Sequence, residues 1–178
     1  MRRVICVLGL LAAFLGTANA NAAVAEASFT QQSGSSWTVD LTITNDGLPA
    51  AITGFTVYFS ETLFAGLSVV TSPAEWDSIA VEPDVALASA GFLDSFLIDP
   101  TVPLSVGQTQ GGFRLAFTFL GVGTPPMLPF DIVDQSYNVL FSGVTAPPVL
   151  EPSTAVLTGL GLLGLLAFRG RLARRSQT

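Results

Sequence analysis

The chain contains no histidine and no lysine, and Cys6 is its single cysteine. Without histidine, a Ser-His-Asp or Cys-His catalytic arrangement is impossible, and zinc sites built from His or Cys ligands are excluded as well. A phosphate-binding loop is also missing, because Gly121 and Gly123 are followed by Thr-Pro-Pro and by no lysine. Carboxylates are the only groups left for acid–base catalysis, as in a glycosidase. The residue inventory therefore predicts a protein that is not an enzyme and needs no cofactor.

Positive charge is scarce outside the two ends of the chain. All seven basic residues are arginines, and residues 21–150 hold twelve acidic residues against one arginine, Arg114, which gives a net charge of −11. Binding to nucleic acid requires a basic surface that meets the phosphates, so this class of partner is excluded. We expect Arg114 to pair with a carboxylate on the outward face of its strand rather than to recognise a ligand.

The N-terminal segment has the three parts of a secretory signal peptide. Two arginines at the start are followed by the apolar run VICVLGLLAAFLG and by the small-residue stretch TANANA. Residues 1–22 are therefore predicted to direct export, with cleavage after Ala20 or after Ala22; a retained signal anchor is the alternative. Cys6 lies inside this segment, so the mature chain has no disulfide and must be stabilised by an ordinary core.

The C-terminal segment combines an apolar run with a basic end. Residues 153–168 carry no charge, and as a helix these sixteen residues cover roughly 24 Å, slightly less than a bilayer core. Basic residues after such a run stay on the cytoplasmic side, so they act as a stop-transfer signal and leave the body outside. The residues in this role are Arg169, Arg171, Arg174 and Arg175. Pro152 disfavours helix at Glu151, which we expect in extended chain beside the membrane.

This order of features resembles the PEP-CTERM sorting signal of Gram-negative bacteria. Glu151, Pro152 and Ser153 match its motif, and Leu150 stands where the family has a first proline. The resemblance implies recognition by an exosortase-type membrane enzyme, which removes or exchanges the basic end. It also implies a transient stay in the inner membrane, followed by release to the cell surface or the extracellular space, in a setting with secreted polysaccharide. The alternative is a plain tail anchor that is never processed.

The body of the chain has the period of β-strands. Apolar and polar residues alternate strictly over residues 37–44, so one face of this strand is buried and the other is not. Turn-forming residues follow at Asn45-Asp46-Gly47. The other predicted strands are residues 25–31, 52–60, 67–71, 79–81, 85–89, 92–98, 113–119 and 137–141. We therefore predict an all-β fold, a single antiparallel β-sandwich of about seven to nine strands with a phenylalanine-rich interior.

Two stretches of the body have a resemblance of their own. Residues 55–63 resemble the strand and turn of cohesin-like surface sandwiches, and residues 129–134 resemble the portion before the last strand of many PEP-CTERM proteins. The resemblance implies a binding or scaffolding module. The predicted organisation is a signal peptide (1–22), a β-sandwich (23–146), a proline-rich linker (147–150) and a sorting segment (151–178).

Four acidic residues are close together in one predicted loop region and suit the oxygen ligands of calcium. They are Glu75, Asp77, Glu82 and Asp84. The loop lacks the D-x-D-x-D-G pattern of a calcium-binding loop, however, and the alternative is a solvated acidic edge that discourages strands from pairing between molecules. No metal site is predicted as the leading interpretation.

Two aromatic residues are candidates for a ligand surface. Tyr58 lies opposite the apolar face of its strand, and Trp76 is expected in a loop, so either ring could stack on a sugar. The alternatives are that Tyr58 packs under a loop and that Trp76 covers the edge of the sandwich.

The leading functional prediction is an exported, non-enzymatic protein of the cell surface or extracellular matrix, associated with exopolysaccharide. The alternative is a carbohydrate- or protein-binding module held permanently by its C-terminal helix.

Overall fold

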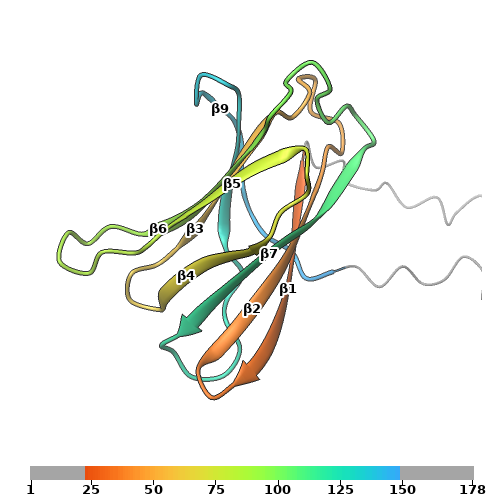
Figure 1. Cartoon of the computed structure of the whole chain (residues 1–178). Helices are drawn as coiled ribbons and strands as arrows, with labels where there is room; N and C mark the ends of the chain where they lie inside the picture. The colour runs from red at the N-terminus through yellow and green to blue at the C-terminus, as the bar shows by residue number, and fades with distance from the viewer. Residues whose placement is uncertain (1–22, 149–178) are drawn as a thin grey trace, which may run out of the picture. The chain divides into compact units, whose positions relative to one another are not determined.

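The computed structural model describes residues 23–148, which fold as two stacked antiparallel β-sheets (Figure 1). The strands are β1 (Val24–Ser33), β2 (Ser36–Thr44), β3 (Gly54–Phe59), β4 (Phe64–Thr71), β5 (Trp76–Val81), β6 (Gly91–Leu97), β7 (Thr109–Phe119), β8 (Pro129–Val133) and β9 (Val139–Val144). One sheet has the order β1-β2-β7-β4 and the other β5-β6-β3-β8-β9. The predicted all-β sandwich is confirmed for this part of the chain.

All strands of the described residues lie in one compact unit, which ends at Pro147. Residues 23–148 include no helix long and apolar enough to cross a membrane. The predicted signal peptide, the motif at Glu151-Pro152-Ser153, the apolar run 153–168 and the arginines after it lie outside the described residues.

Alternation along the strands explains the interior. On β2, the four apolar side chains at positions 37, 39, 41 and 43 are buried, while the residues between them are partly exposed. β7 lies beside β2 and repeats the pattern, so Val39 is opposite Leu115 and Leu41 is opposite Phe113. Because a strand presents successive side chains to opposite faces, each sheet contributes one apolar face to a shared core.

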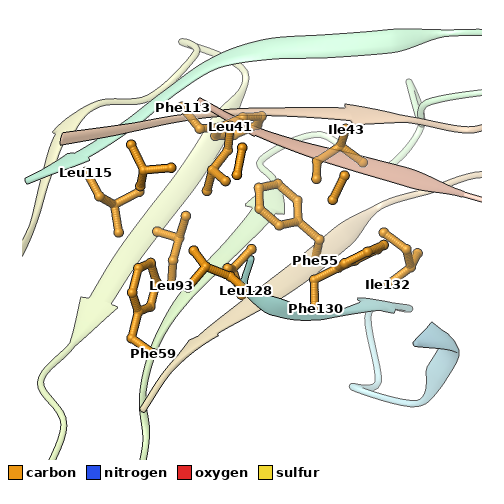
Figure 2. Close-up of a cluster of buried hydrophobic side chains, with 14 of the residues drawn as sticks. Leu41, Ile43, Phe55, Phe59, Leu93, Phe113, Leu115, Leu128, Phe130 and Ile132 are labelled. Carbon is orange, nitrogen blue, oxygen red and sulfur yellow. The ribbon is translucent and has the colours of Figure 1, made fainter. Parts of the chain in front are cut away.

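Aromatic rings fill the gap between the sheets. Phe55 of β3 is 0% exposed, and its ring lies edge-to-face on Phe113 of the opposite sheet, with ring centres 4.9 Å apart. Trp76 packs against both, 5.7 Å from Phe55 and 5.3 Å from Phe113. Figure 2 shows Phe55 and Phe59 pointing from one sheet towards Leu41, Phe113 and Leu115 on the other. Rings of this size span the spacing of about 10 Å between packed sheets.

One edge of the four-stranded sheet is extended by the end of the described chain. Ala27 N donates to Ala146 O, and Ala146 N donates to Ala25 O, both over 2.8 Å. The segment after β9 therefore runs parallel to β1 and satisfies part of its outer edge. Covering an edge in this way removes hydrogen-bonding groups that could otherwise pair with another chain.

Two expectations from the sequence need correction, and one strand was not predicted. Residues 85–89 are not a strand but the turn between β5 and β6, where Asp84 Oδ1 accepts hydrogen bonds from Ala86 N and Leu87 N. Tyr137 lies in the turn before β9, so the last strand begins at Val139. Residues 129–133 form a strand, β8, that the sequence analysis did not predict. The short side-chain acceptor at Asp84 explains the first difference, because it closes a turn locally.

A long connection between β6 and β7 is tied to the body by Asn45, which is 0% exposed. Its Nδ2 donates to Leu104 O over 3.1 Å, and its Oδ1 accepts from Leu48 N over 2.9 Å. Asn45 therefore closes its own turn and also holds a loop 59 residues away. The sequence indicated the turn but gave no sign of the distant partner.

Replacement of Phe55 by alanine is expected to lower the free energy of unfolding by about 3–5 kcal/mol, because it removes a fully buried ring and leaves a cavity beside Trp76 and Phe113. Urea unfolding of the purified chain measures this loss. Val122→Ala is the control, since Val122 is fully exposed and its change should stay within about 0.5 kcal/mol. Equal stabilities of the two variants would contradict the role of the aromatic core.

Candidate binding face

The outward face of the five-stranded sheet, here called the outer face, carries a row of polar side chains. On β3 the inward residues are Phe55, Val57 and Phe59, so Thr56 and Tyr58 point outward. Strand pairing places Asp94 of β6 opposite Thr56 on one side and Asp131 of β8 opposite Thr56 on the other. Thr56 therefore lies between two carboxylates that are remote in the sequence.

Hydroxyl groups satisfy both carboxylates. Thr56 Oγ1 donates to Asp94 Oδ1 over 2.6 Å. Tyr58 Oη donates to Asp131 Oδ2 over 2.8 Å, and Ser142 Oγ of β9 donates to Asp131 Oδ1 over 2.6 Å. Both oxygens of Asp131 are thus occupied, which makes this carboxylate a structural acceptor that links β3, β8 and β9.

The environment of Tyr58 keeps its phenol neutral. Partial burial removes water from the hydroxyl and is the main reason that the pKa of Tyr58 rises to about 12. The hydrogen bond to Asp131 and the negative charges of Asp131 and Asp94 raise this pKa further in the same direction. Tyr58 is therefore a hydrogen-bond donor throughout the physiological pH range.

Aromatic side chains lie beside this polar row. Phe92 of β6 is opposite Tyr58 in the strand pairing, and Phe96 lies over Gly54, where any Cβ would collide with its ring. Tyr137 meets Phe96 at a ring-centre distance of 4.9 Å and is 67% exposed. The outer face therefore ends in an accessible aromatic pair.

The backbone of Tyr137 is in the left-handed region, with φ at 60°, which residues other than glycine rarely adopt. Asp134 holds the turn, because its Oδ1 accepts from Ser136 N over 2.8 Å and from Asn138 N over 2.9 Å. Asn138 Nδ2 also donates to Asp134 Oδ2, and these bonds lower the pKa of Asp134. Alternation had placed Tyr137 in a strand and not on an exposed turn; Asp134 and Asn138 around it are the turn signal that the sequence offers.

Aliphatic residues extend the outer face onto the edge strand β5. Ile79 is 58% exposed and Val81 is 38% exposed, and they pair with Asp94 and Phe92 of β6. Together with the aromatic pair, they leave several accessible apolar side chains on this sheet.

The two aromatic residues suggested by the sequence behave differently. Trp76 is the first residue of β5 and is 4% exposed, so its expected place in an exposed loop is wrong. Its ring belongs to the core, where it packs on Phe55 and Phe113. Tyr58 does point outward, but it is half-buried and its hydroxyl is bonded to Asp131.

The four acidic residues considered for calcium do not converge. Glu82 accepts a hydrogen bond from Gly66 N over 3.0 Å, and Asp84 closes its own turn. Asp77 lies on β5 and Glu75 precedes that strand. Within residues 23–148, no three Asp, Glu, His or Cys side chains are grouped so that they could hold a metal ion. The cluster of carboxylates that the calcium hypothesis required is therefore not present among residues 23–148.

Arg114 is paired as expected. Its Nε lies 2.7 Å from Asp40 Oδ1, and its Nη2 lies 2.9 Å from Asp40 Oδ2, across the β2–β7 pairing. Both side chains are partly exposed, so solvent screens the pair and it contributes little to stability.

No protein-family model and no curated protein matches the chain. Among solved structures it is similar to an uncharacterized protein from Nocardia farcinica that has an immunoglobulin-like fold, at 18% identity over 74% of this chain and 88% of that one, with a TM-score of 0.48. It is also similar to a type II cohesin domain from the cellulosome of Acetivibrio cellulolyticus, at 12% identity over 65% and 77%, with a TM-score of 0.33. The sandwich itself is defined by the strand pairings described above.

Tyrosinate absorbance during an alkaline titration tests the environment of Tyr58. We expect a step near pH 12 that disappears in Tyr58→Phe, and stability that falls between about pH 10 and 12, because only the unfolded chain ionises this phenol at the lower value. Asp131→Asn should lower the midpoint only in part, since burial is the largest cause of the shift. A wild-type chain without the high step would contradict the described environment.

Proposed function

We propose that the chain is an exported, non-enzymatic β-sandwich protein of the cell surface or extracellular matrix, which contacts secreted polysaccharide through its outer face. Delivery would follow the route implied by residues 151–178, with recognition of Glu151-Pro152 by an exosortase-type enzyme in the inner membrane and loss of the arginine-rich end.

The accessible outer face is the observation that carries the proposal. It combines the aromatic pair Phe96–Tyr137 with hydroxyl and carboxylate groups on adjacent strands. An aromatic ring presents an apolar surface to the carbon–hydrogen face of a sugar, while nearby polar groups exchange hydrogen bonds with its hydroxyls. The backbone strain accepted at Tyr137 supports a role for that exposed ring.

Five carboxylates of the described residues have environments that support a role without catalysis. Asp94 and Asp131 accept bonds from neighbouring hydroxyls, and Asp40 is paired with Arg114. Hydrogen bonds within turns lower the pKa of Asp99 and of Asp134. A general acid in a glycosidase requires the opposite shift, towards a raised pKa.

Intact-mass analysis of the protein from its native cells, with membrane and medium fractions kept apart, tests the delivery route. We expect a surface or medium species that begins after Ala20 or Ala22, ends near Glu151 and lacks the terminal arginines. A membrane species that keeps Arg169 and the residues after it would contradict processing. The chain would then be a binding module with a permanent tail anchor.

Co-sedimentation with the native extracellular polysaccharide tests the outer face. Tyr137→Ala should weaken binding by about three- to tenfold, which corresponds to the loss of one aromatic contact. Val70→Ala is the matched control, because Val70 is 52% exposed and lies on β4 of the other sheet. Equal binding by Tyr137→Ala and wild type, or an equal loss in both variants, would contradict contact through this face.

A further inference from the structure

A cleft of about 820 Å³ opens between two connections of the sandwich. One wall is the segment before and at the start of β5, residues 74–76, and the other is the long connection between β6 and β7 with the start of β7, residues 97–110. The cleft has the size of a small-molecule site, and the outer-face residues Tyr58 and Tyr137 are not among those that line it.

Backbone hydrogen bonds fix both walls. Ile98 N donates to Glu75 O over 2.9 Å, which joins the two segments directly. Leu104 exchanges two backbone hydrogen bonds with Ile52, and its carbonyl also accepts from the buried Asn45. The cleft is therefore preformed, so a ligand would not have to order the loop in order to bind.

Trp76 supplies a polar group with an unusual environment. The side chain is 4% exposed and its ring is covered by Phe55 and Phe113. No residue within 23–148 accepts a hydrogen bond from its indole N–H. In the same range, every side-chain nitrogen or oxygen atom that is fully buried does have a hydrogen-bond partner, so the indole nitrogen is not fully buried. The N–H must therefore keep a small contact with solvent. Because Trp76 also lines the cleft, the geometry points to a ring edge that opens there.

Two glutamines in the lining, Gln108 and Gln110, have a hydrogen-bond donor and an acceptor, respectively, that are not used within the protein. Gln108 Oε1 accepts from Ser105 N over 2.7 Å, which leaves the amide N–H groups of Gln108 as donors. Gln110 Nε2 donates to Gly111 O over 2.8 Å, which leaves Oε1 of Gln110 as an acceptor. Glu75 adds an exposed carboxylate, and Leu104 adds apolar surface.

We propose that this cleft binds a short neutral saccharide, with the Trp76 N–H as a donor at its base. A sugar hydroxyl both donates and accepts, so it matches a lining that offers donors and acceptors together. An anionic ligand would be repelled by Glu75 and Asp99, and the lining contains no basic residue. A cationic ligand would be attracted by these carboxylates but would offer no acceptor to the donor groups of Trp76 and Gln108, whereas a neutral sugar pairs with donors and acceptors alike. This site is independent of the polysaccharide contact proposed for the outer face.

The test uses NMR spectra of the full chain, labelled with ¹⁵N and kept in detergent. The spectra show one indole N–H resonance for each of the two tryptophans, and the spectrum of Trp37→Phe assigns them. Maltotriose and cellotriose are the probes, with trigalacturonate as the anionic comparison and spermidine as the cationic one. We expect a neutral trisaccharide at millimolar concentration to shift the Trp76 resonance and to leave that of Trp37 in place. If neither trisaccharide shifts it, or if only a charged comparison compound does, the proposal is wrong.

Variants separate the cleft from the outer face. Trp76→Phe removes the N–H and keeps a ring, and it should weaken trisaccharide binding about three- to tenfold, as expected for one hydrogen bond. Gln108→Ala, at an exposed position, should weaken it similarly without disturbing the core. Tyr137→Ala should leave trisaccharide affinity unchanged. Unchanged affinity in Gln108→Ala together with a loss in Tyr137→Ala would overturn the assignment to the cleft.

Discussion

Contacts between aromatic rings across the two sheets are the interaction on which the rest of this structure depends. Residues 23–148 contain no cysteine, so no disulfide bond joins the two sheets. Phe55, Trp76 and Phe113 meet near one part of the core, and Phe59, Phe64 and Phe117 meet near another. Because close-packed rings tolerate little displacement, they also fix which side chains of each strand point inward.

That constraint determines what the outer face and the cleft can present. With Phe55 and Phe59 directed inward, Thr56 and Tyr58 must point outward, where the register brings Asp94 and Asp131 beside them. Trp76 belongs to the same aromatic group, so the core holds its ring while one edge reaches the cleft. The aromatic core thus positions Tyr58 on the outer face and the ring of Trp76 beside the cleft.

The sequence predicted the elements that rest on local alternation and missed those that rest on distant partners. β2 and the second part of β7 were evident because apolar residues recur at every second position over residues 37–43 and 113–119. β8 was missed because it begins at Pro129 and closely follows Pro125 and Pro126, and prolines are typical of loops rather than strands. Trp76 was placed in a loop because its acidic neighbours suggested exposure, whereas Phe113, 37 residues away, buries it. The partnership of Tyr58 with Asp131 likewise depends on a register that a single sequence does not contain.

Hydroxyl-radical footprinting of the protein within its native matrix, compared with the purified chain, shows whether the outer face is the contact surface. We expect reduced oxidation of Phe92, Phe96 and Tyr137 in the matrix. We also expect unchanged oxidation at the exposed Val70 and Leu120, away from the outer face. Equal oxidation of Tyr137 in both samples, or protection confined to Val70 and Leu120, would contradict contact through this face.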